Sequence, residues 1–328
     1  MLGKQQLGPL RLTILMPVYN DWQTAILLIN KIDALTITDI FINVLLVDDG
    51  STDPYPESFS IKNIYNISNI EILQLNRNLS HQRAIAIGLT HIKKAVECDA
   101  VLVMDSDGED LPEDIFNLVE SFEKKGRKMA VFAKRAKRSE SWLFKLCYRA
   151  YLFSNWLFIG KIFKVGNFSI IPYDYLAPLV VSAELWNHYA ATVFKLRLPV
   201  DLLPISRGVR LHGKSKMNFV SLIVHGLSAI SVFGEIVGTR FFILFFSIST
   251  IFMALVVSGL LVLFSTDMTL SCHVAYGIGL ILLLLSNGLG FVASFLLSLL
   301  GNRNLATFLP IRDYRYFIKR SIAIHHFP

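Results

Sequence analysis

Three acidic side chains alternate along one short segment of the chain: Asp105, Asp107 and Glu109. They follow the apolar run at 100–104, which is typical of a buried strand. An Asp-x-Asp sequence at a strand end commonly holds a divalent cation against a diphosphate, and alternating side chains on an extended backbone point the same way. Because hard oxygen ligands favour Mg²⁺ or Mn²⁺ over zinc, the sequence predicts a site for one of these two cations.

Basic side chains that could neutralise phosphate charge occur in two places. Arg135 follows the apolar run at 129–133, and a second group precedes a long apolar region nearer the C-terminus. Within the basic run at 134–138 we expect only Arg135 to reach the site, since such runs usually form solvated surfaces. The second group comprises Arg207, Arg210, Lys214 and Lys216.

The elements that must position these residues alternate between two patterns. Because the strands are apolar on both faces and alternate with helices, we expect an α/β domain with a parallel sheet covered on both sides. In such sheets the ligand lies beyond the carboxyl ends of the strands, where Pro17, Asp48, Asp49, Asp105 and Asp107 fall. The expected strands are 12–16, 43–47, 70–75, 100–104 and 129–133, and the expected helices are 21–32, 80–94 and 112–124.

Composition indicates a soluble domain joined to a membrane anchor. Hydrophobic residues make up 53% of the 328 residues, and the mean hydropathy is +0.50. The segments 241–264 and 274–300 contain no charged side chain, and each exceeds the ~20 residues needed to cross a bilayer. A buried hairpin of a soluble protein is the alternative. The net charge of +7 suits anionic lipids and phosphorylated substrates, and we expect no nucleic-acid partner because no recognition motif is present.

Flanking charges predict the orientation of the two apolar segments. Arg240 precedes the first, basic residues follow the second, and the loop at 265–273 has no Lys or Arg, so the positive-inside rule places both termini in the cytoplasm. We expect amphipathic interface helices at 139–158 and 218–233. The predicted organisation is a cytoplasmic catalytic domain (1–216), interface helices (217–240), two transmembrane helices (241–302) and a basic cytoplasmic tail (303–328).

Short motifs in a fixed order make the chain resemble the family 2 glycosyltransferases of GT-A fold, and among them the polyprenyl-phosphate glycosyltransferases. They are Pro-Val-Tyr-Asn at 17–20, Asp-Asp-Gly-Ser at 48–51, Asn-Arg-Asn-Leu-Ser-His-Gln at 76–82, the acidic segment at 104–113 and Gly-Lys-Ser-Lys at 213–216. The resemblance implies a Rossmann-like, mostly parallel sheet with helices on both faces. It also implies transfer of one sugar from a nucleotide sugar, UDP favoured over GDP, to a polyprenyl phosphate at the bacterial inner membrane, with inversion.

The resemblance also implies roles for individual residues. Pro17, Tyr19 and Asp49 would contact the nucleoside. The whole nucleotide-sugar site would comprise Pro17, Tyr19, Asn20, Asp49, Asp105, Ser106, Asp107, Arg135, Arg210 and Lys216. The catalytic residues would be Asp105, Asp107 and Arg135, and the metal ligands Asp105, Asp107 and Glu109. The lipid-phosphate site would comprise Arg207, Arg210, Lys214 and Lys216. Related enzymes assemble through their membrane helices, so a homo-oligomer of this kind is compatible with the sequence.

Two residues depart from the family pattern. Glu109 stands where Gln is usual, and Asn167 stands where many bacterial members have Asp. If that Asp serves as a base, this chain lacks it, although a lipid phosphate is ionised near pH 7 and needs no deprotonation. Two other functions stay open. One is transfer to another lipid or to a polysaccharide, although the chain lacks the Gln-x-x-Arg-Trp motif that processive polysaccharide synthases need. The other is a non-catalytic membrane scaffold, which the complete acidic triplet disfavours.

Overall fold

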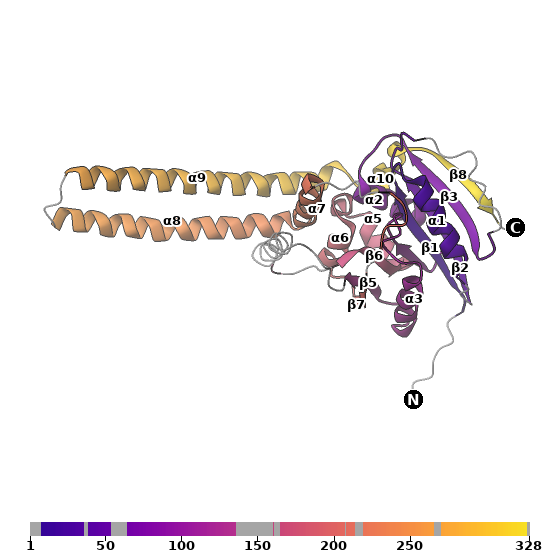
Figure 1. Cartoon of the computed structure of the whole chain (residues 1–328). Helices are drawn as coiled ribbons and strands as arrows, with labels where there is room; N and C mark the ends of the chain where they lie inside the picture. Colours follow the sequence, from indigo (N-terminus) through magenta and orange to yellow (C-terminus); the bar gives the residue numbers. More distant parts are fainter. Residues whose placement is uncertain are drawn as a thin grey trace, which may run out of the picture. The chain divides into compact units, whose positions relative to one another are not determined.

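In the computed structural model, the described residues are 8–35, 39–53, 64–135, 160, 165–206, 208–213, 219–265 and 270–326. The chain divides into two compact units (Figure 1). The first comprises Met1–Leu146, Phe163–Val232 and Thr307–Pro328, and the second comprises Cys147–Ile162 and Phe233–Ala306. The C-terminal residues therefore belong to the same unit as the N-terminal strands.

The first unit is built on one sheet whose order, in the described part of the chain, is β7-β5-β6-β4-β1-β2-β3-β8. Strand β1 runs parallel to β2 and β4, β2 to β3, and β5 to β7. Strand β6 is antiparallel to β4 and β5, and β8 is antiparallel to β3. The strands are β1 (Leu10–Val18), β2 (Ile40–Asp48), β3 (Ile67–Leu75), β4 (Ala100–Val103), β5 (Ala130–Arg135), β6 (Val165–Pro172), β7 (Val200–Ile205) and β8 (Ile318–His326).

Helices cover both faces of this sheet, as the continuous apolar runs predict. One face packs against α1 (Trp22–Asp33) and α3 (Asp114–Lys124), and the other against α2 (His81–Ala95), α5 (Leu176–Val180) and α6 (Tyr189–Lys195). Successive strand residues enter opposite cores: Ile14 packs with α1, and Leu15 packs with α2. The shorter elements are η1 (Tyr173–Tyr175), η2 (Ala183–Trp186), α10 (Pro310–Asp313) and η3 (Tyr314–Phe317).

The five strands and three helices expected in the first half of the chain are confirmed, with boundaries shifted by at most three residues. The α/β class and the mostly parallel sheet are also confirmed. The sequence did not lead us to expect β6, β7 or β8. Strand β8 lies within the segment 303–328, which the sequence presents only as a basic tail.

Helix α7 (Phe219–Ser231) falls where an amphipathic helix is expected. The other expected amphipathic helix, at 139–158, lies outside the described residues.

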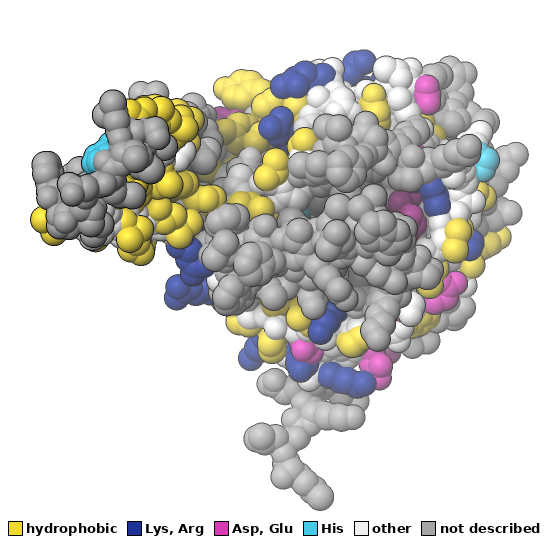
Figure 2. All heavy atoms as spheres, turned by 60° about the vertical axis from the view of Figure 1, so that its left-hand side comes forward, with side chains coloured by type: hydrophobic (Ala, Val, Ile, Leu, Met, Phe, Trp, Pro, Cys, Tyr) yellow, Lys and Arg dark blue, Asp and Glu magenta, His cyan; other side chains and the backbone are white. Residues whose placement is uncertain are grey.

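The second unit contains the two long apolar helices α8 (Gly234–Ser265) and α9 (Leu270–Thr307). Two windows within them, Gly234–Gly259 with mean hydropathy 2.5 and Tyr276–Ser294 with 1.9, are long and apolar enough to cross a membrane. Most of their side chains are not buried by protein, and the visible surface of the helices is predominantly hydrophobic (Figure 2). Among their described side chains, polar contacts join them between the Asn287 amide and the Ser249 hydroxyl, and from the Tyr276 hydroxyl to the Leu255 carbonyl oxygen at 3.2 Å.

Candidate active site

The acidic segment forms a tight turn after β4 ends. The Ser106 hydroxyl donates to the Pro17 carbonyl oxygen at 2.8 Å, which ties the turn to the end of β1. The Asp105 backbone N–H donates to the Asp110 carboxylate at 3.0 Å. Gly108 has φ +78°, a left-handed conformation that glycine adopts without strain. The backbone is thus not extended here, so the condition under which alternation would aim the three carboxylates in one direction is not met.

The basic segment at 208–213 lies against this acidic turn. Arg210 Nη1 is 3.4 Å from Asp107 Oδ2, and its other amino group contacts the Asp21 carboxylate. Backbone hydrogen bonds hold the two segments together, from Gly208 N–H to the Glu109 carbonyl at 2.8 Å and from Leu211 N–H to the Asp107 carbonyl at 3.1 Å. The structure therefore brings together Asp107 and Arg210, two residues that the sequence assigns to one site.

A chain of side-chain amides reaches the same turn from the other side. The Tyr189 backbone N–H donates to Gln82 Oε1 at 2.8 Å, and Gln82 Nε2 donates to Asn167 Oδ1 at 3.1 Å. Asn167 Nδ2 lies 2.9 Å from His81 Nε2, and that ring nitrogen is 3.1 Å from Asp105 Oδ1. Because a backbone N–H can only donate, it fixes the orientation of both amides along the chain.

The electrostatics at His81 follow from this arrangement. Burial lowers the pKa of His81, but the charge of Asp105, aided by those of Asp49 and Asp107, outweighs burial and raises the pKa above its ordinary value. Asn167, which departs from the family pattern, is thus a buried link between Gln82 and His81. The sequence does not connect these residues, since 85 positions separate Gln82 from Asn167.

Two loops at the ends of β1 and β2 are joined by Asn20. The Asn20 backbone N–H donates to the Ser51 hydroxyl at 2.9 Å, and its side-chain oxygen accepts from the Thr52 backbone N–H at 2.8 Å. The Asp48 carboxylate accepts from the Ser51 N–H at 2.9 Å, which closes the turn after β2. Gly50 has φ +68°, and a Cβ there would lie 2.4 Å from the backbone of the next loop, so the turn requires glycine.

Asp49 connects this turn to the loop after β3. Its carboxylate accepts from the Leu79 backbone N–H at 2.7 Å, and the residue is 3% exposed. Burial raises the pKa of Asp49 to about 6, against the opposing effect of the backbone hydrogen bonds from Leu79 and Ser80 and the charge of His81. Tyr19, by contrast, is 41% exposed at the same edge. At the carboxyl ends of β1 and β2, the Tyr19 ring is thus exposed to solvent and the Asp49 carboxyl group is buried.

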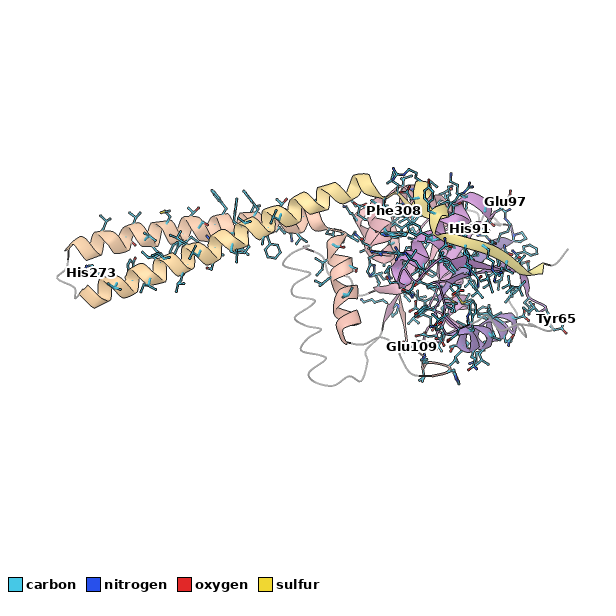
Figure 3. All side chains as sticks on the ribbon, turned by 90° about the horizontal axis from the view of Figure 1, so that it is seen from above. Tyr65, His91, Glu97, Glu109, His273 and Phe308 are labelled. Carbon is cyan, nitrogen blue, oxygen red and sulfur yellow. The ribbon has the colours of Figure 1, made fainter. Side chains whose placement is uncertain are left out.

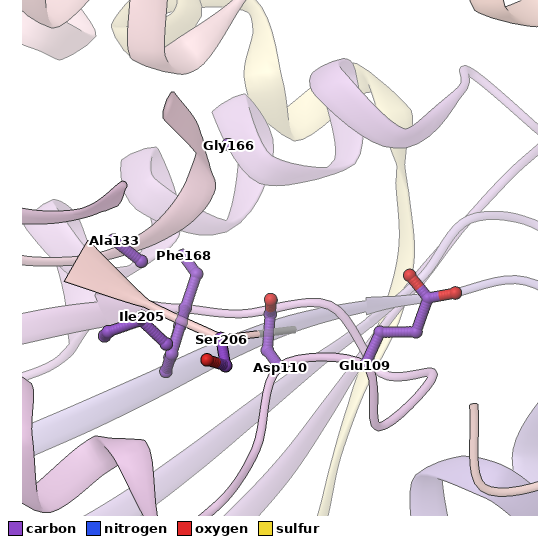
Figure 4. A pocket seen from close by; sticks show the side chains of 7 residues that line it. All are labelled: Glu109, Asp110, Ala133, Gly166, Phe168, Ile205 and Ser206. Carbon is purple, nitrogen blue, oxygen red and sulfur yellow. The ribbon is translucent and has the colours of Figure 1, made fainter. Parts of the chain in front are cut away.

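Some of the expected site residues cannot be placed. Arg135 ends β5, but its side chain lies outside the described structure, as do Arg207, Lys214 and Lys216 entirely. A small hollow near the acidic turn is lined by residues of β5, β6, β7 and the turn itself, and the Glu109 carboxylate extends away from the rest of it (Figure 4). Within the described ranges, no group of three or more His, Cys, Asp or Glu side chains is arranged to hold a metal ion by itself.

Comparison with known families shows which family the chain belongs to. Residues 13–177 match the model of glycosyl transferase family 2. The chain belongs to glycosyl transferase family 2. The matched segment of this family 2 chain runs from within β1 to the start of α5 and includes the acidic turn, the Asn20 and Asp49 loops, His81 and Asn167.

Curated relatives of this family 2 chain share a common description. The undecaprenyl-phosphate 4-deoxy-4-formamido-L-arabinose transferase of Edwardsiella ictaluri is 27% identical over 247 residues, covering 69% of this chain and 72% of the relative. The enzyme of the same description from Enterobacter sp. is 27% identical over 253 residues, covering 71% and 74%. Among solved structures, glucosyl-3-phosphoglycerate synthase from Mycobacterium tuberculosis with Mn²⁺, UDP-glucose and phosphoglyceric acid has a TM-score of 0.48 at 15% identity, covering 70% of this chain and 80% of that one.

Proposed function

We propose that the protein transfers a single sugar from a nucleoside diphosphate to a polyprenyl phosphate at a membrane surface, with UDP favoured over GDP as the nucleotide. The contact between Asp107 and Arg210 is the observation that carries this proposal. It sets a carboxylate and a guanidinium side by side at the carboxyl end of β4, where a cation and a diphosphate could both be held. Membership of family 2, the description of the relatives and the two long apolar helices support the same function.

The acidic turn suits a hard divalent cation. Asp105, Asp107 and Glu109 offer carboxylate oxygens, the donors that Mg²⁺ and Mn²⁺ prefer, and substrate phosphates commonly supply further ligands to such ions. A bound cation would neutralise charge on the departing diphosphate. Since the described residues form no complete ligand set by themselves, we infer that the cation and the nucleotide bind together.

The basic residues would hold phosphate groups. Arg210 pairs with carboxylates of Asp107 and Asp21, and we infer that it exchanges one of them for a phosphate of the donor or the lipid. Its planar guanidinium can contact two oxygens at once. Arg135, Arg207, Lys214 and Lys216 would complete the phosphate sites, which places basic charge where the leaving diphosphate and the incoming lipid phosphate approach each other.

The proposed chemistry is one in-line displacement. An oxygen of the lipid phosphate forms a bond to the anomeric carbon while the bond from that carbon to the donor diphosphate breaks, and the electron pair leaves with the diphosphate. Attack from the side opposite the leaving group inverts the anomeric centre. A lipid phosphate is ionised near neutral pH, so no side chain at position 167 is needed to remove a proton.

The proposed topology keeps both termini in the cytoplasm, with two spans within 241–302. The pairing of β8 with β3 supports it, because strands in one sheet must lie on the same side of a membrane. The catalytic domain then includes residues from Thr307 onward in addition to those expected at 1–216, with interface helices within 217–240. For β7 and β8 to lie on the same side, the chain between them must cross the membrane an even number of times, as two spans would.

A direct assay tests the function. Membranes containing the full-length protein would receive radiolabelled UDP- and GDP-sugars with added undecaprenyl phosphate and Mg²⁺ or Mn²⁺. We expect a labelled lipid that mild acid cleaves, with a nucleoside diphosphate as the second product. A labelled polymer would instead indicate a polysaccharide acceptor, and no transfer with any donor would indicate a non-catalytic scaffold.

A further inference from the structure

The last strand of the sheet comes from the far end of the chain. Strand β8 follows α9 after about ten residues and pairs antiparallel with β3, with Arg320 opposite Gln74. Figure 3 shows this strand, in yellow, running along the sheet beside His91. The His91 ring is 2.8 Å from the Glu71 carboxylate, which also accepts from the Ser321 hydroxyl at 2.5 Å.

A line of hydrogen bonds leads from this strand to the turn after β2. Arg320 Nε donates to Gln74 Oε1 at 2.6 Å, and Gln74 Nε2 donates to Asp48 Oδ2 at 3.1 Å. The other oxygen of Asp48 accepts from the Ser51 backbone N–H at 2.9 Å. Gln74 is 9% exposed and Asp48 is 4% exposed, so the middle of this line is shielded from water.

The polarity of the line is set at both ends. A guanidinium can only donate and an ionised carboxylate can only accept, so the Gln74 amide between them has one favourable orientation. Without the donor at Arg320, the buried Gln74 oxygen would lose its partner, which is costly for a polar group shielded from water. The amide would then shift toward another donor, which would weaken its contact with the buried Asp48 carboxylate.

We propose that Arg320 and Gln74 are positioning residues for the nucleoside end of the donor site, and that they act through Asp48 on the turn at 50–53. This inference rests on the proposed function, since it assumes that the turn contacts the nucleoside. The same turn is held from the other side by Asn20, next to the open ring of Tyr19. A displaced turn would therefore move the residues on both sides of the nucleoside.

Other contacts hold the C-terminal segment in place independently of Arg320. Phe308 and Phe317 pack on Trp186, with ring centroids 3.9 and 5.1 Å away. The Asn76 backbone N–H donates to the Phe317 carbonyl oxygen at 2.8 Å, and Ser321 bonds Glu71. We therefore expect Arg320→Met, which keeps the apolar stem and loses the donor, to fold with β8 still paired.

The test uses the full-length protein in lipid nanodiscs, with Lys319→Met as the control. Lys319 is the exposed neighbour on the same strand, so the control removes the same charge. Hydrogen–deuterium exchange of the peptide covering 50–53 should be about tenfold faster in Arg320→Met, the scale of losing a hydrogen bond to a charged group, and unchanged in Lys319→Met. Equal exchange in the two variants would overturn the proposal.

A second measurement asks whether the nucleotide depends on this line. Binding of UDP, or of GDP if the donor assay selects it, should weaken in Arg320→Met while kcat at saturating donor changes little. Gln74→Met should weaken it similarly, and the double variant should be no worse than the worse single variant, because both break one line. Additive losses would contradict a shared line. If the wild type bound neither nucleotide, the proposed function would fail, while the exchange experiment would still decide the role of Arg320.

Discussion

Asp107 and Arg210 are 103 positions apart in the sequence, yet their side chains meet at the carboxyl end of β4, with 3.4 Å between Nη1 and Oδ2. Arg210 also contacts Asp21 at the start of α1. The guanidinium thus joins the segment before the apolar helices to two elements of the N-terminal half. A cation that binds Asp107 and a diphosphate that binds Arg210 would compete with this ion pair, so substitution of either residue should affect donor binding.

Asp107→Asn should lower sugar transfer by about a hundredfold or more, because a neutral amide is a weaker metal ligand and cannot offset the guanidinium. Folding should change little, since Asp21 still pairs with Arg210. Initial rates across a Mn²⁺ titration, with thermal unfolding, check both points. Asp174→Asn is the matched control, because Asp174 is exposed on η1, near the amino end of β4 and away from the acidic turn. Wild-type rates in Asp107→Asn would refute the metal assignment.

Arg210→Lys keeps the positive charge but removes the planar fork that contacts Asp107 and Asp21 together. We expect about a tenfold loss of kcat/KM for the donor, since an ammonium group cannot reproduce a bidentate contact. Steady-state kinetics with varied donor measure this loss. Arg11→Lys makes the same change in an exposed ion pair with Glu97 and Asp99 and should be neutral. An equal effect of the two variants would remove Arg210 from the site.

The raised pKa of Asp49 predicts how the free energy of unfolding depends on pH. The pKa of this carboxyl is raised from 3.8 to about 6 in the folded protein, so the folded state binds the proton more tightly than the unfolded state does. Its contribution is fully present below pH 4 and is lost as the pH rises through 6, by up to about 3 kcal/mol. Asp49→Asn should reduce this decline in chemical unfolding experiments between pH 4 and 7. An unchanged pH profile would show that the carboxyl is not perturbed.

Asn167 allows a test of whether the reaction needs a base at this position. Asn167→Asp should leave the transfer rate within about twofold of wild type, because an ionised lipid phosphate needs no deprotonation. Asn167→Leu should destabilise the fold by about 1–3 kcal/mol, since it leaves the buried Gln82 amide without its acceptor. Rates with undecaprenyl phosphate and unfolding curves separate the two effects. A large gain of activity in Asn167→Asp would indicate that a base does contribute.

The parts of the fold that the sequence predicts correctly are those with a local signal. Strands β1 and β2 are continuous apolar runs because both of their faces are buried, and each ends at a polar motif. Strand β6 begins at Val165 and inserts antiparallel between β4 and β5, an arrangement that no local periodicity specifies. Strand β8 carries only a short signal, since Ile322 and Ile324 alternate and face one core while Ile318 faces the other, and its partner strand is about 250 positions away.

The candidate site also has parts that the sequence predicts and parts that it does not. The position of Asp105, Asp107 and Asp49 at one edge of the sheet could be predicted, because each follows a strand and parallel strands end at the same edge. The turn at 106–108 could not be predicted from alternation, since its direction depends on the Ser106 contact with Pro17 and on Gly108. The contacts of His81 with Asn167 and of Arg320 with Gln74 depend on the full sheet order, which only the structure reveals.

The position of β8 at the end of the chain has a consequence for biosynthesis. A ribosome produces β1 to β7 first, then α8 and α9, and only afterwards the strand that covers β3. Until then β3 is an open edge, on which a nascent chain is prone to pair wrongly. The sheet can therefore be completed only after the two apolar helices have left the ribosomal exit tunnel. Completion of the active fold is thereby linked in time to insertion of these helices into the membrane.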